Sequence, residues 1–293
     1  MSAPLLGAIE AGGTKFVLAV GQGPDAIAAR HVIPTQDPAE TLGAAAAWFA
    51  NAGTIAALGI ASFGPVELDR ASPRWGQLLA TPKPGWAGCD LAGYFGKAHG
   101  VPVELETDVN GAAMAEARLG AGRGGTSLAY VTVGTGIGGG LVIEGRPVHG
   151  IAHPEMGHLY PRRAPDDTFA GICPHHGDCL EGLVSGPAIQ ARWGTSLSHL
   201  PPDHPGHAIV ASYLAQLCNT IFAVTAAQTV VLGGGVTKAP GLIAAVRAEA
   251  RRLDGGYLPG GGGHRIEAPV LGEDSGIAGA LLLAEAALVE GCQ

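Results

Sequence analysis

Residues 5–20 have the sequence LLGAIEAGGTKFVLAV, in which two short apolar runs flank a glycine-containing turn. Apolar runs of this length on either side of such a turn predict a β-hairpin. Gly12 and Gly13 have no side chains, so the backbone can approach an anion, while Thr14 and Lys15 add a hydroxyl and a positive charge. The turn could therefore bind phosphate, although a Gly-Gly turn between strands is more often only a turn.

A second copy of this pattern lies at residues 127–143, with the sequence SLAYVTVGTGIGGGLVI. Its turn begins with Gly134, Thr135 and Gly136. Repetition of strand, glycine turn and strand predicts two lobes of like topology, each directing a glycine turn at a common cleft. Two such turns make a nucleotide-binding site more plausible than either turn alone.

The remaining sequence alternates apolar strand candidates with alanine-rich helix candidates, which predicts an α/β fold. A third glycine turn, formed by Gly233, Gly234 and Gly235, follows a strand candidate at 229–232 and precedes a helix candidate at 241–253. Three glycines between a strand and a helix let a flat ring or a ribose lie against the backbone.

Polar residues follow the strand candidate at 101–106 and precede a helix candidate that begins at Gly111. They include Thr107, Asp108 and Asn110. The carboxyl end of a strand, just before a helix, is the usual place for site residues in α/β folds. Either Asp108 or Asn110 could instead only cap the helix, and the sequence leaves both interpretations open.

Two cysteines and three histidines cluster in the middle of a chain that has only five cysteines. Cys173, His176 and Cys179 are separated from one another by two residues, and His158 could supply a fourth ligand. This pattern predicts a zinc site, which is structural because four protein ligands leave no position for a substrate. The alternatives are ordinary thiols, a small disulfide loop, or His175 as the ligand in place of His176.

The amino-acid composition and net charge limit which partners and which cellular location are expected. With 293 residues, 47% hydrophobic and 14% charged, the chain can bury the cores of two lobes. Its net charge of −8 argues against non-specific binding to nucleic acid or to an anionic membrane, so small molecules are the expected partners. We find no basic and apolar leader and no uninterrupted apolar run of membrane-spanning length, and five cysteines fit a reducing compartment. We therefore expect a cytoplasmic protein.

These motifs together resemble a sugar kinase of the ROK family (repressor, open reading frame, kinase), and most closely its zinc-containing bacterial fructokinase branch. The resemblance extends from Gly7 to Gly279. It rests on six motifs in order: EAGGTK at 10–15, TDVN at 107–110, GTGIGGG at 134–140, EMGH at 155–158, CPHHGDCLE at 173–181 and LGGGV at 232–236.

The resemblance implies an actin- and hexokinase-type fold, with two ribonuclease-H-like lobes and a cleft for ATP and a hexose. The expected domains are a small lobe at 1–110, completed by the C-terminal helix, and a larger lobe at 111–293 with a zinc-binding insertion at about 155–182. We also expect a homodimer.

The same resemblance implies roles for individual residues. Asp108 would be the general base, with Asn110 beside it. Sugar contacts would come from Thr107, Glu155, His158 and Glu181, or from the scaffold that holds them. Phosphate contacts would come from Gly12, Gly13, Thr14, Lys15, Gly134, Thr135 and Gly136, and an adenosine contact from Gly233, Gly234 and Gly235. The zinc ligands would be His158, Cys173, His176 and Cys179, and Mg²⁺ would accompany ATP.

The implied reaction is phosphorylation of a hexose, most closely fructose at O6. Glucose, mannose or N-acetylmannosamine are the alternative acceptors within the family. Two departures bear on this choice: Glu10 stands where many family members have Asp, and Thr107 stands where many have Asn. A metallohydrolase would need an open zinc position and no paired phosphate turns, and a non-catalytic sugar sensor would be expected to lose the base.

Overall fold

The computed structural model describes residues 3–81, 83–260 and 262–291. The chain forms two compact units, each assembled from separate segments. Unit 1 comprises Met1–Ala115, His149–His153 and Glu273–Gln293, and unit 2 comprises Glu116–Val148 and Pro154–Gly272. Unit 1 therefore extends to residue 115, past the domain boundary predicted after residue 110. It also includes the segment His149–His153, which in the sequence lies between two segments of unit 2.

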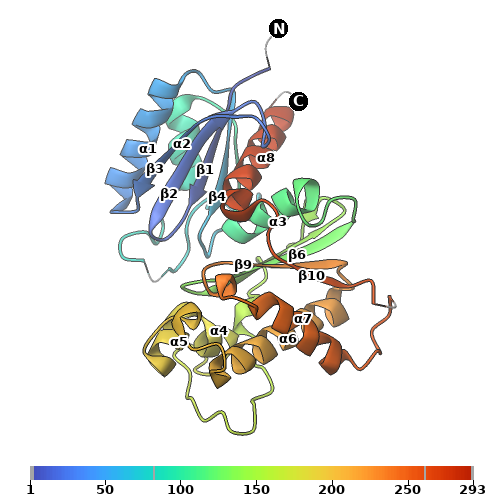
Figure 1. The fold of residues 1–293 in the computed structure, drawn as a ribbon. Helices are drawn as coiled ribbons and strands as arrows, with labels where there is room; N and C mark the ends of the chain where they lie inside the picture. The colour runs from blue at the N-terminus through green and yellow to red at the C-terminus, as the bar shows by residue number, and fades with distance from the viewer. Residues whose placement is uncertain (1–2, 82, 261, 292–293) are drawn as a thin grey trace. The chain divides into compact units, whose positions relative to one another are not determined.

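Unit 1 contains a five-stranded sheet in the order β3-β2-β1-β4-β5 (Figure 1). The first three strands pair antiparallel and the last three pair parallel. The hairpin predicted for residues 5–20 is confirmed, since β1 and β2 pair along their length. The strands are β1 (Leu6–Ala11), β2 (Lys15–Gly21), β3 (Ile27–Pro34), β4 (Ala57–Ser62) and β5 (Val103–Thr107).

Unit 2 contains a second five-stranded sheet, in the order β10-β9-β6-β7-β8. Its pairing repeats that of unit 1, with β6 in the central position of β1. Strands β7 and β8 continue antiparallel on one side of β6, and β9 and β10 continue parallel on the other. The predicted internal repeat is thus confirmed at the level of strand order. The strands are β6 (Ser127–Val133), β7 (Ile137–Ile143), β8 (Arg146–Pro147), β9 (Thr229–Gly233) and β10 (Arg265–Glu267).

Helices cover both faces of the unit 1 sheet, because successive residues of β1 and β2 point to opposite faces. Ile9 and Phe16 belong to a core that includes residues of α1 and α2, whereas Ala8 and Val17 belong to a second core built with α8 (Figure 1). These helices are α1 (Pro38–Ala52), α2 (Leu91–His99) and α8 (Ser275–Glu290).

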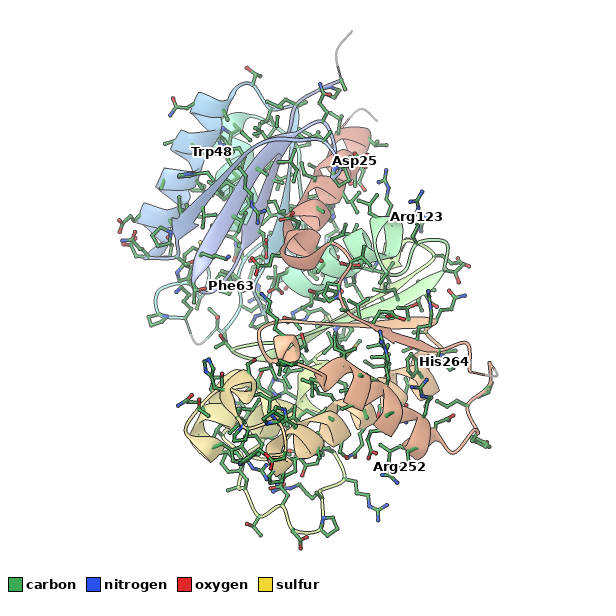
Figure 2. The ribbon with its side chains drawn as sticks, in the orientation of Figure 1. Asp25, Trp48, Phe63, Arg123, Arg252 and His264 are labelled. Atoms are coloured by element: carbon green, nitrogen blue, oxygen red, sulfur yellow. The ribbon has the colours of Figure 1, made fainter. Side chains whose placement is uncertain are left out.

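A fully buried tryptophan, Trp86, joins residues 83–86 to the first of these cores. The ring of Trp86 lies 5.5 Å from that of Phe16 on β2 and 5.5 Å from that of Phe63, which follows β4 and is labelled in Figure 2. Its indole nitrogen donates a hydrogen bond to the carbonyl of Gln36 at 2.9 Å, so the polar group is satisfied although the ring is buried.

The core of unit 2 lies between its sheet and α6 and α7 (Figure 1). Among the described residues, α6 is the one helix long and apolar enough to cross a membrane, and half of its apolar window is buried in the protein. Polar residues such as His207, Gln216 and Asn219 interrupt its sequence, and core helices of soluble proteins pass the same test. The helices of this unit are α4 (Leu180–Val184), α5 (Gly186–Trp193), α6 (Pro205–Thr225) and α7 (Leu242–Asp254).

Candidate active site and zinc centre

Asp108 lies where the sequence placed it, at the carboxyl end of a parallel strand. It is the first residue of α3 (Asp108–Leu119) and directly follows β5. The hydroxyl of Thr107 accepts the backbone N–H of Asn110 at 3.2 Å, which is the geometry of a helix cap. Thr107 therefore caps α3, and Asp108 Oδ1 also accepts a backbone hydrogen bond in the first turn, from the N–H of Val109 at 2.8 Å.

Glu10 is a second carboxylate near Asp108. Burial, reinforced by the negative charge of Asp108, raises the pKa of Glu10 to about 7, while Lys15 and Arg30 oppose the shift. Its Oε2 atom is buried and has no hydrogen-bond partner in the described part of the chain. An unpaired, buried carboxylate oxygen beside another carboxylate is a group that a divalent cation would satisfy.

The glycine turn between β1 and β2 is held by hydrogen bonds to its carbonyl groups. The N–H of Gly12 donates to the carbonyl of Lys15 at 2.9 Å, and the hydroxyl of Thr35 donates to the carbonyl of Gly12 at 2.7 Å. The ammonium group of Lys83 donates to the carbonyl of Gly13 at 2.6 Å. Because several carbonyls of the turn are already bound from within unit 1, the conformation of the turn is fixed before any phosphate arrives.

The corresponding turn of unit 2 has a different support. Glu181 accepts the N–H of Ile137 at 2.9 Å, immediately after the turn. A Cβ atom on Gly136 would lie 2.6 Å from the Glu181 carboxylate, so a larger residue here would displace that carboxylate. The carbonyl of Gly134 accepts the N–H of Gly186, the first residue of α5, at 2.7 Å. The structure thus brings Glu181 to the glycine turn.

The third glycine turn lies against the same end of the unit 2 sheet. Gly234 has a φ of +91°, and a Cβ atom there would lie 2.4 Å from the carbonyl oxygen of Val133, the last residue of β6. Only glycine allows this approach. Since β6 and β9 are parallel neighbours, the turns at 134–136 and 233–235 lie at the same edge of the sheet.

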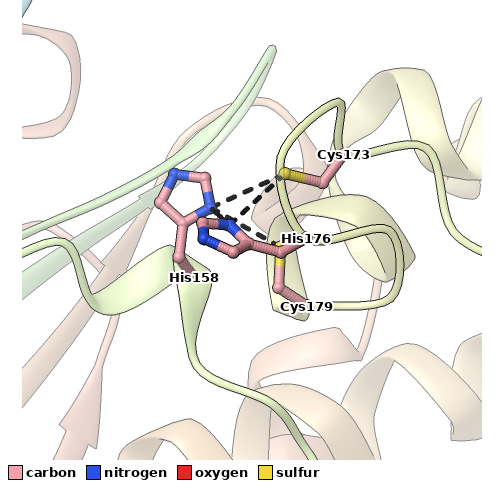
Figure 3. Close-up of side chains that lie close together, drawn as sticks. All are labelled: His158, Cys173, His176 and Cys179. Carbon is pink, nitrogen blue, oxygen red and sulfur yellow. Dashed lines mark hydrogen bonds between the residues drawn. The ribbon is translucent and has the colours of Figure 1, made fainter.

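The predicted zinc ligands converge in one place, at the start of α4 (Figure 3). The donor atoms of His158, Cys173, His176 and Cys179 all lie within 4.8 Å of one another. The group includes His176 and not His175. It therefore favours His176, which is separated by two residues from each cysteine, as the ligand. Cys173 and Cys179 are free thiols, so the alternative of a small disulfide loop is not what the structure contains.

The distances between these donors match the edges of a tetrahedral zinc site. Zinc bonds of ordinary length predict about 3.3 Å between two nitrogen ligands and about 3.6 Å between sulfur and nitrogen. His158 Nδ1 lies 3.2 Å from His176 Nδ1, 3.8 Å from Cys173 Sγ and 3.5 Å from Cys179 Sγ. The residues present therefore fit zinc. Burial raises the pKa of the Cys179 thiol to about 11, so a cation is needed to favour the thiolate at neutral pH.

His158 connects the zinc ligands to Glu155. Its Nδ1 atom faces the other ligands, while its Nε2 atom lies 3.9 Å from Glu155 Oε2. The segment that carries both residues packs closely on β7, since a Cβ atom on Gly157 would lie 1.9 Å from the carbonyl oxygen of Ile137. Both predicted sugar contacts thus lie near β7: Glu155 is on the segment that packs against it, and Glu181 accepts the N–H of Ile137.

A buried aspartate anchors the long loop that precedes the zinc ligands. The side chain of Asp167 is fully buried and accepts both terminal nitrogens of Arg192, at 3.0 and 2.6 Å, together with the hydroxyl of Tyr213. Burial alone would raise the pKa of Asp167, but the hydrogen bonds from Tyr213 and Arg192 outweigh it and hold the pKa below 3.8. Arg163 also contacts Asp167, and it pairs with Asp178 of the zinc loop at 3.1 Å.

Asn110 is completely buried and takes part in a second polar cluster. Its side-chain nitrogen donates to Glu106 Oε2 at 2.8 Å, and His149 Nε2 lies 2.7 Å from Glu106 Oε1. The hydrogen bond that His149 donates to the Glu106 carboxylate raises the pKa of His149. All three residues belong to unit 1, because His149 lies in the segment that returns to this unit.

The sequence interpretation missed four of these polar residues: Lys83, Glu106, His149 and Asp167. Lys83 lies in a proline-containing loop, and Asp167 in a polar span without periodicity. His149 contacts Asn110 from 39 residues away, so only the fold brings them together. A signal was present only for Glu106, which precedes Thr107 and Asp108 at the end of a strand candidate.

Comparison with known proteins agrees with this architecture. The family model described as ROK family matches residues 6–287. A fructokinase from Zymomonas mobilis is 46% identical, with 97% of each chain covered, and a putative fructokinase from Bacillus subtilis is 41% identical, with 97% of this chain and 96% of that protein covered. The crystal structure of a ROK hexokinase from Thermus thermophilus superposes with a TM-score of 0.80 at 29% identity, covering 98% of this chain and all of that one.

The match of the family model over nearly the whole chain, the full-length relatives and the repeated five-stranded sheets lead to one conclusion. The chain belongs to the ROK family of sugar kinases and regulators and has the actin- and hexokinase-like fold.

Proposed function

We propose that this chain is an ATP-dependent hexose kinase whose acceptor is D-fructose. The observation that carries the kinase assignment is Asp108, a carboxylate at the carboxyl end of β5 in a unit that also holds a preformed glycine turn. The choice of fructose is supported by the relatives named fructokinase, at 46% and 41% identity over nearly the full chain.

In the proposed reaction the oxygen of a sugar hydroxyl, O6 for fructose, attacks the γ-phosphorus of ATP. The bond between that phosphorus and the bridging oxygen breaks, and ADP leaves with the electron pair. The hydroxyl proton passes to Asp108. Since the transition state of phosphoryl transfer is loose, the protein mainly aligns the reactants and stabilises charge.

Unit 1 supplies the base and one phosphate turn. Asp108 is proposed as the base because it is the first residue of α3 and directly follows the carboxyl end of β5. The turn of Gly12, Gly13, Thr14 and Lys15 offers backbone N–H groups and an exposed ammonium group to the phosphates. Thr107 and Asn110 are proposed to shape the sugar site beside the base.

Unit 2 supplies the second phosphate turn and the adenosine contact. The turn of Gly134, Thr135 and Gly136 would bind phosphate, supported by Glu181 and by the start of α5. The turn of Gly233, Gly234 and Gly235, at the same edge of the sheet, would hold adenosine against its backbone. Glu155, His158 and Glu181 are proposed to hold sugar hydroxyls or to position the groups that do.

Two metal ions are proposed. Glu10, with its buried and partnerless oxygen, is the residue that fits the Mg²⁺ accompanying ATP, which when bound neutralises charge on the transferring phosphates. His158, Cys173, His176 and Cys179 would hold zinc, whose four protein ligands leave it a structural role. The zinc would fix His158, and through it Glu155, relative to the start of α4.

An ADP-release assay coupled to a chromogenic reaction tests the proposal. Purified protein is supplied with MgATP and, separately, with fructose, glucose, mannose and N-acetylmannosamine. We expect the highest kcat/KM with fructose. A higher value with another hexose would reject the acceptor but not the kinase, whereas no ADP release with any of them would favour a sugar-sensing regulator.

Assembly and location are further proposals on this function. A homodimer is expected, and size-exclusion chromatography with light scattering measures the mass directly. A cytoplasmic location fits the metabolite substrates, ATP and a hexose, and cell fractionation tests it.

A further inference from the structure

A hydrogen-bonded cluster of three side chains brackets Asp108 in unit 1. Glu106 is two residues before Asp108, Asn110 is two residues after it, and His149 reaches both from the returning segment. The distances are 2.8 Å from Asn110 Nδ2 to Glu106 Oε2, 2.7 Å from His149 Nε2 to Glu106 Oε1, and 3.4 Å from His149 Nε2 to Asn110 Nδ2.

Glu106 can orient its neighbours but is poorly placed to react. Its side chain is only 7% exposed, and both of its oxygens are engaged. Oε2 accepts the N–H of Thr107 at 3.1 Å in addition to the Asn110 amide. A buried carboxylate is retained at such a position only when hydrogen bonds compensate its lost hydration, and here they fix three groups next to Asp108.

His149 differs from Glu106 because it is open on one side. Its side chain is 34% exposed, and Glu106 holds the ring through Nε2. The other ring nitrogen, Nδ1, makes no hydrogen bond with the residues that the structure describes. The hydrogen bond at Nε2 therefore fixes the orientation of the imidazole and leaves Nδ1 available. A histidine that binds a ligand through one ring nitrogen usually makes such a hydrogen bond through the other.

Asn110 adds a second observation that points to a ligand. The residue is 0% exposed, and its Oδ1 atom is buried without a hydrogen-bond partner in the described part of the chain. Buried polar atoms are nearly always satisfied in native proteins, so an unsatisfied one indicates a missing partner such as a water or a ligand hydroxyl. Asn110 Oδ1, the acceptor without a partner, thus belongs to the same cluster as His149 Nδ1.

We propose that His149 contacts a hydroxyl of the acceptor sugar through Nδ1 and that Glu106 is the residue that positions it, together with Asn110. This inference rests on the proposed function, because it requires Asp108 to face a sugar. A sugar hydroxyl both donates and accepts hydrogen bonds, so it can pair with neutral or with protonated imidazole. His149 then determines sugar affinity without taking part in the chemistry.

The test separates sugar binding from ATP binding. His149→Leu removes the contact, whereas His149→Asn keeps an amide near the position of Nδ1. We expect His149→Leu to raise the KM for fructose about three- to tenfold, the usual effect of losing one neutral hydrogen bond. The KM for ATP and kcat should stay near the wild-type values, since the contact is uniform between ground and transition states. His149→Asn should recover part of the loss.

Glu106→Gln tests the positioning role. The amide cannot accept from both Asn110 and His149, so the fructose KM should rise as in His149→Leu. The double variant should be no worse than the more impaired single variant, because the two residues act through one contact. Should Glu106→Gln fail to fold, the His149 variants decide the matter alone, since that side chain is partly exposed.

His31→Leu is the matched control. His31 is an exposed histidine of unit 1 on β3, stacked on Trp48 of α1 (Figure 2), and its replacement should leave both KM values unchanged. An unchanged fructose KM in His149→Leu, or equal increases for fructose and ATP, overturns the inference while leaving the kinase assignment intact. Wild-type protein without activity on any hexose overturns both.

Discussion

Gly111 and Gly279 lie in backbone contact: a Cβ atom on Gly279 would be 2.1 Å from the carbonyl oxygen of Gly111. Gly111 belongs to α3, which begins with Asp108, and Gly279 belongs to α8, which covers one face of the unit 1 sheet. Two helices can approach this closely only where neither has a side chain. The position of Asp108 is therefore set by contact between the backbones of two helices.

Gly279→Ala should destabilise the protein by several kcal/mol. Backbone cannot move aside as a flexible side chain can, and overpacking of a tight core typically costs about 1–3 kcal/mol or more. Urea unfolding measures the loss. Gly43→Ala is the control, because Gly43 lies inside α1 with nothing within 4 Å of an added Cβ atom. It should stabilise the protein by up to about 1 kcal/mol through helix propensity, and equal effects of the two changes would contradict this reading of the contact.

Asp108→Asn should abolish phosphoryl transfer while leaving fructose bound. The amide keeps the size of the carboxylate but cannot accept a proton, and loss of a general base typically costs about 10²- to 10⁴-fold in rate. The coupled ADP assay measures kcat, and isothermal titration calorimetry measures sugar affinity. A variant with near wild-type kcat would show that the base is another residue.

The purified protein should contain about one zinc per chain, as a four-ligand structural site requires. Cys179→Ala should lose the metal and lower the melting temperature, since the binding energy of a structural zinc contributes to folding. Elemental analysis and thermal unfolding, with and without chelator, measure both effects. Cys89→Ala, which changes a thiol outside the ligand group, should retain full zinc. Zinc-free wild-type protein with unchanged stability in chelator would rule out the site.

Asp167→Asn should cost about 3–5 kcal/mol near neutral pH, the range for breaking a buried ion pair. The native pKa of Asp167 lies below its ordinary value of 3.8, so the stabilisation is complete above that pH and is lost as the pH falls below it. The difference in unfolding free energy between wild type and variant should therefore shrink toward pH 3. Asp178→Asn, at a side chain that is 45% exposed, should cost less than about 1 kcal/mol and serves as control.

Glu10 should have the opposite dependence on pH in metal-free protein. Its pKa rises from 4.5 to about 7 on folding, so native protein binds the extra proton and stability falls as the pH increases between these values. Glu10→Gln removes this loss. The unfolding free energy of the variant should therefore increase relative to that of wild type by up to about 3 kcal/mol from pH 5 to pH 8. Glu40→Gln, which makes the same change at an exposed position of α1, is the control. A constant difference between Glu10→Gln and wild type would argue against a buried, perturbed carboxylate.

The two hairpins and the cluster of His158, Cys173, His176 and Cys179 were predictable because their signals are local. Short apolar runs on either side of a glycine turn identify β1, β2, β6 and β7, whose residues are nearly all buried. Ligand spacing identifies the loop of the Cys/His cluster. Strand β3 was missed because all but one of its eight residues are exposed, which removes the apolar pattern that marks a strand. The helix candidate at Gly111 was placed three residues late, since Thr107 caps α3 with a polar first turn.

The polar clusters were not predictable, because they depend on segments that meet only in the folded chain. No sequence pattern connects His149 to Glu106, or Asp167 to Arg192 and Tyr213. Lys83 likewise meets Gly13 from 70 residues away. The residues of the proposed site were thus easier to predict than the polar residues that contact them.

The return of the chain to unit 1 at α8 has a consequence for biosynthesis. One face of β1 and β2 packs against a helix that leaves the ribosome long after those strands have been made. Until then Leu6, Ala8, Val17 and Ala19 have no apolar cover on that side, and the nascent sheet exposes a surface prone to aggregation. Truncation before Ser275 should therefore yield an insoluble or chaperone-bound product, and the first strand to be translated should be among the last to become protected from solvent.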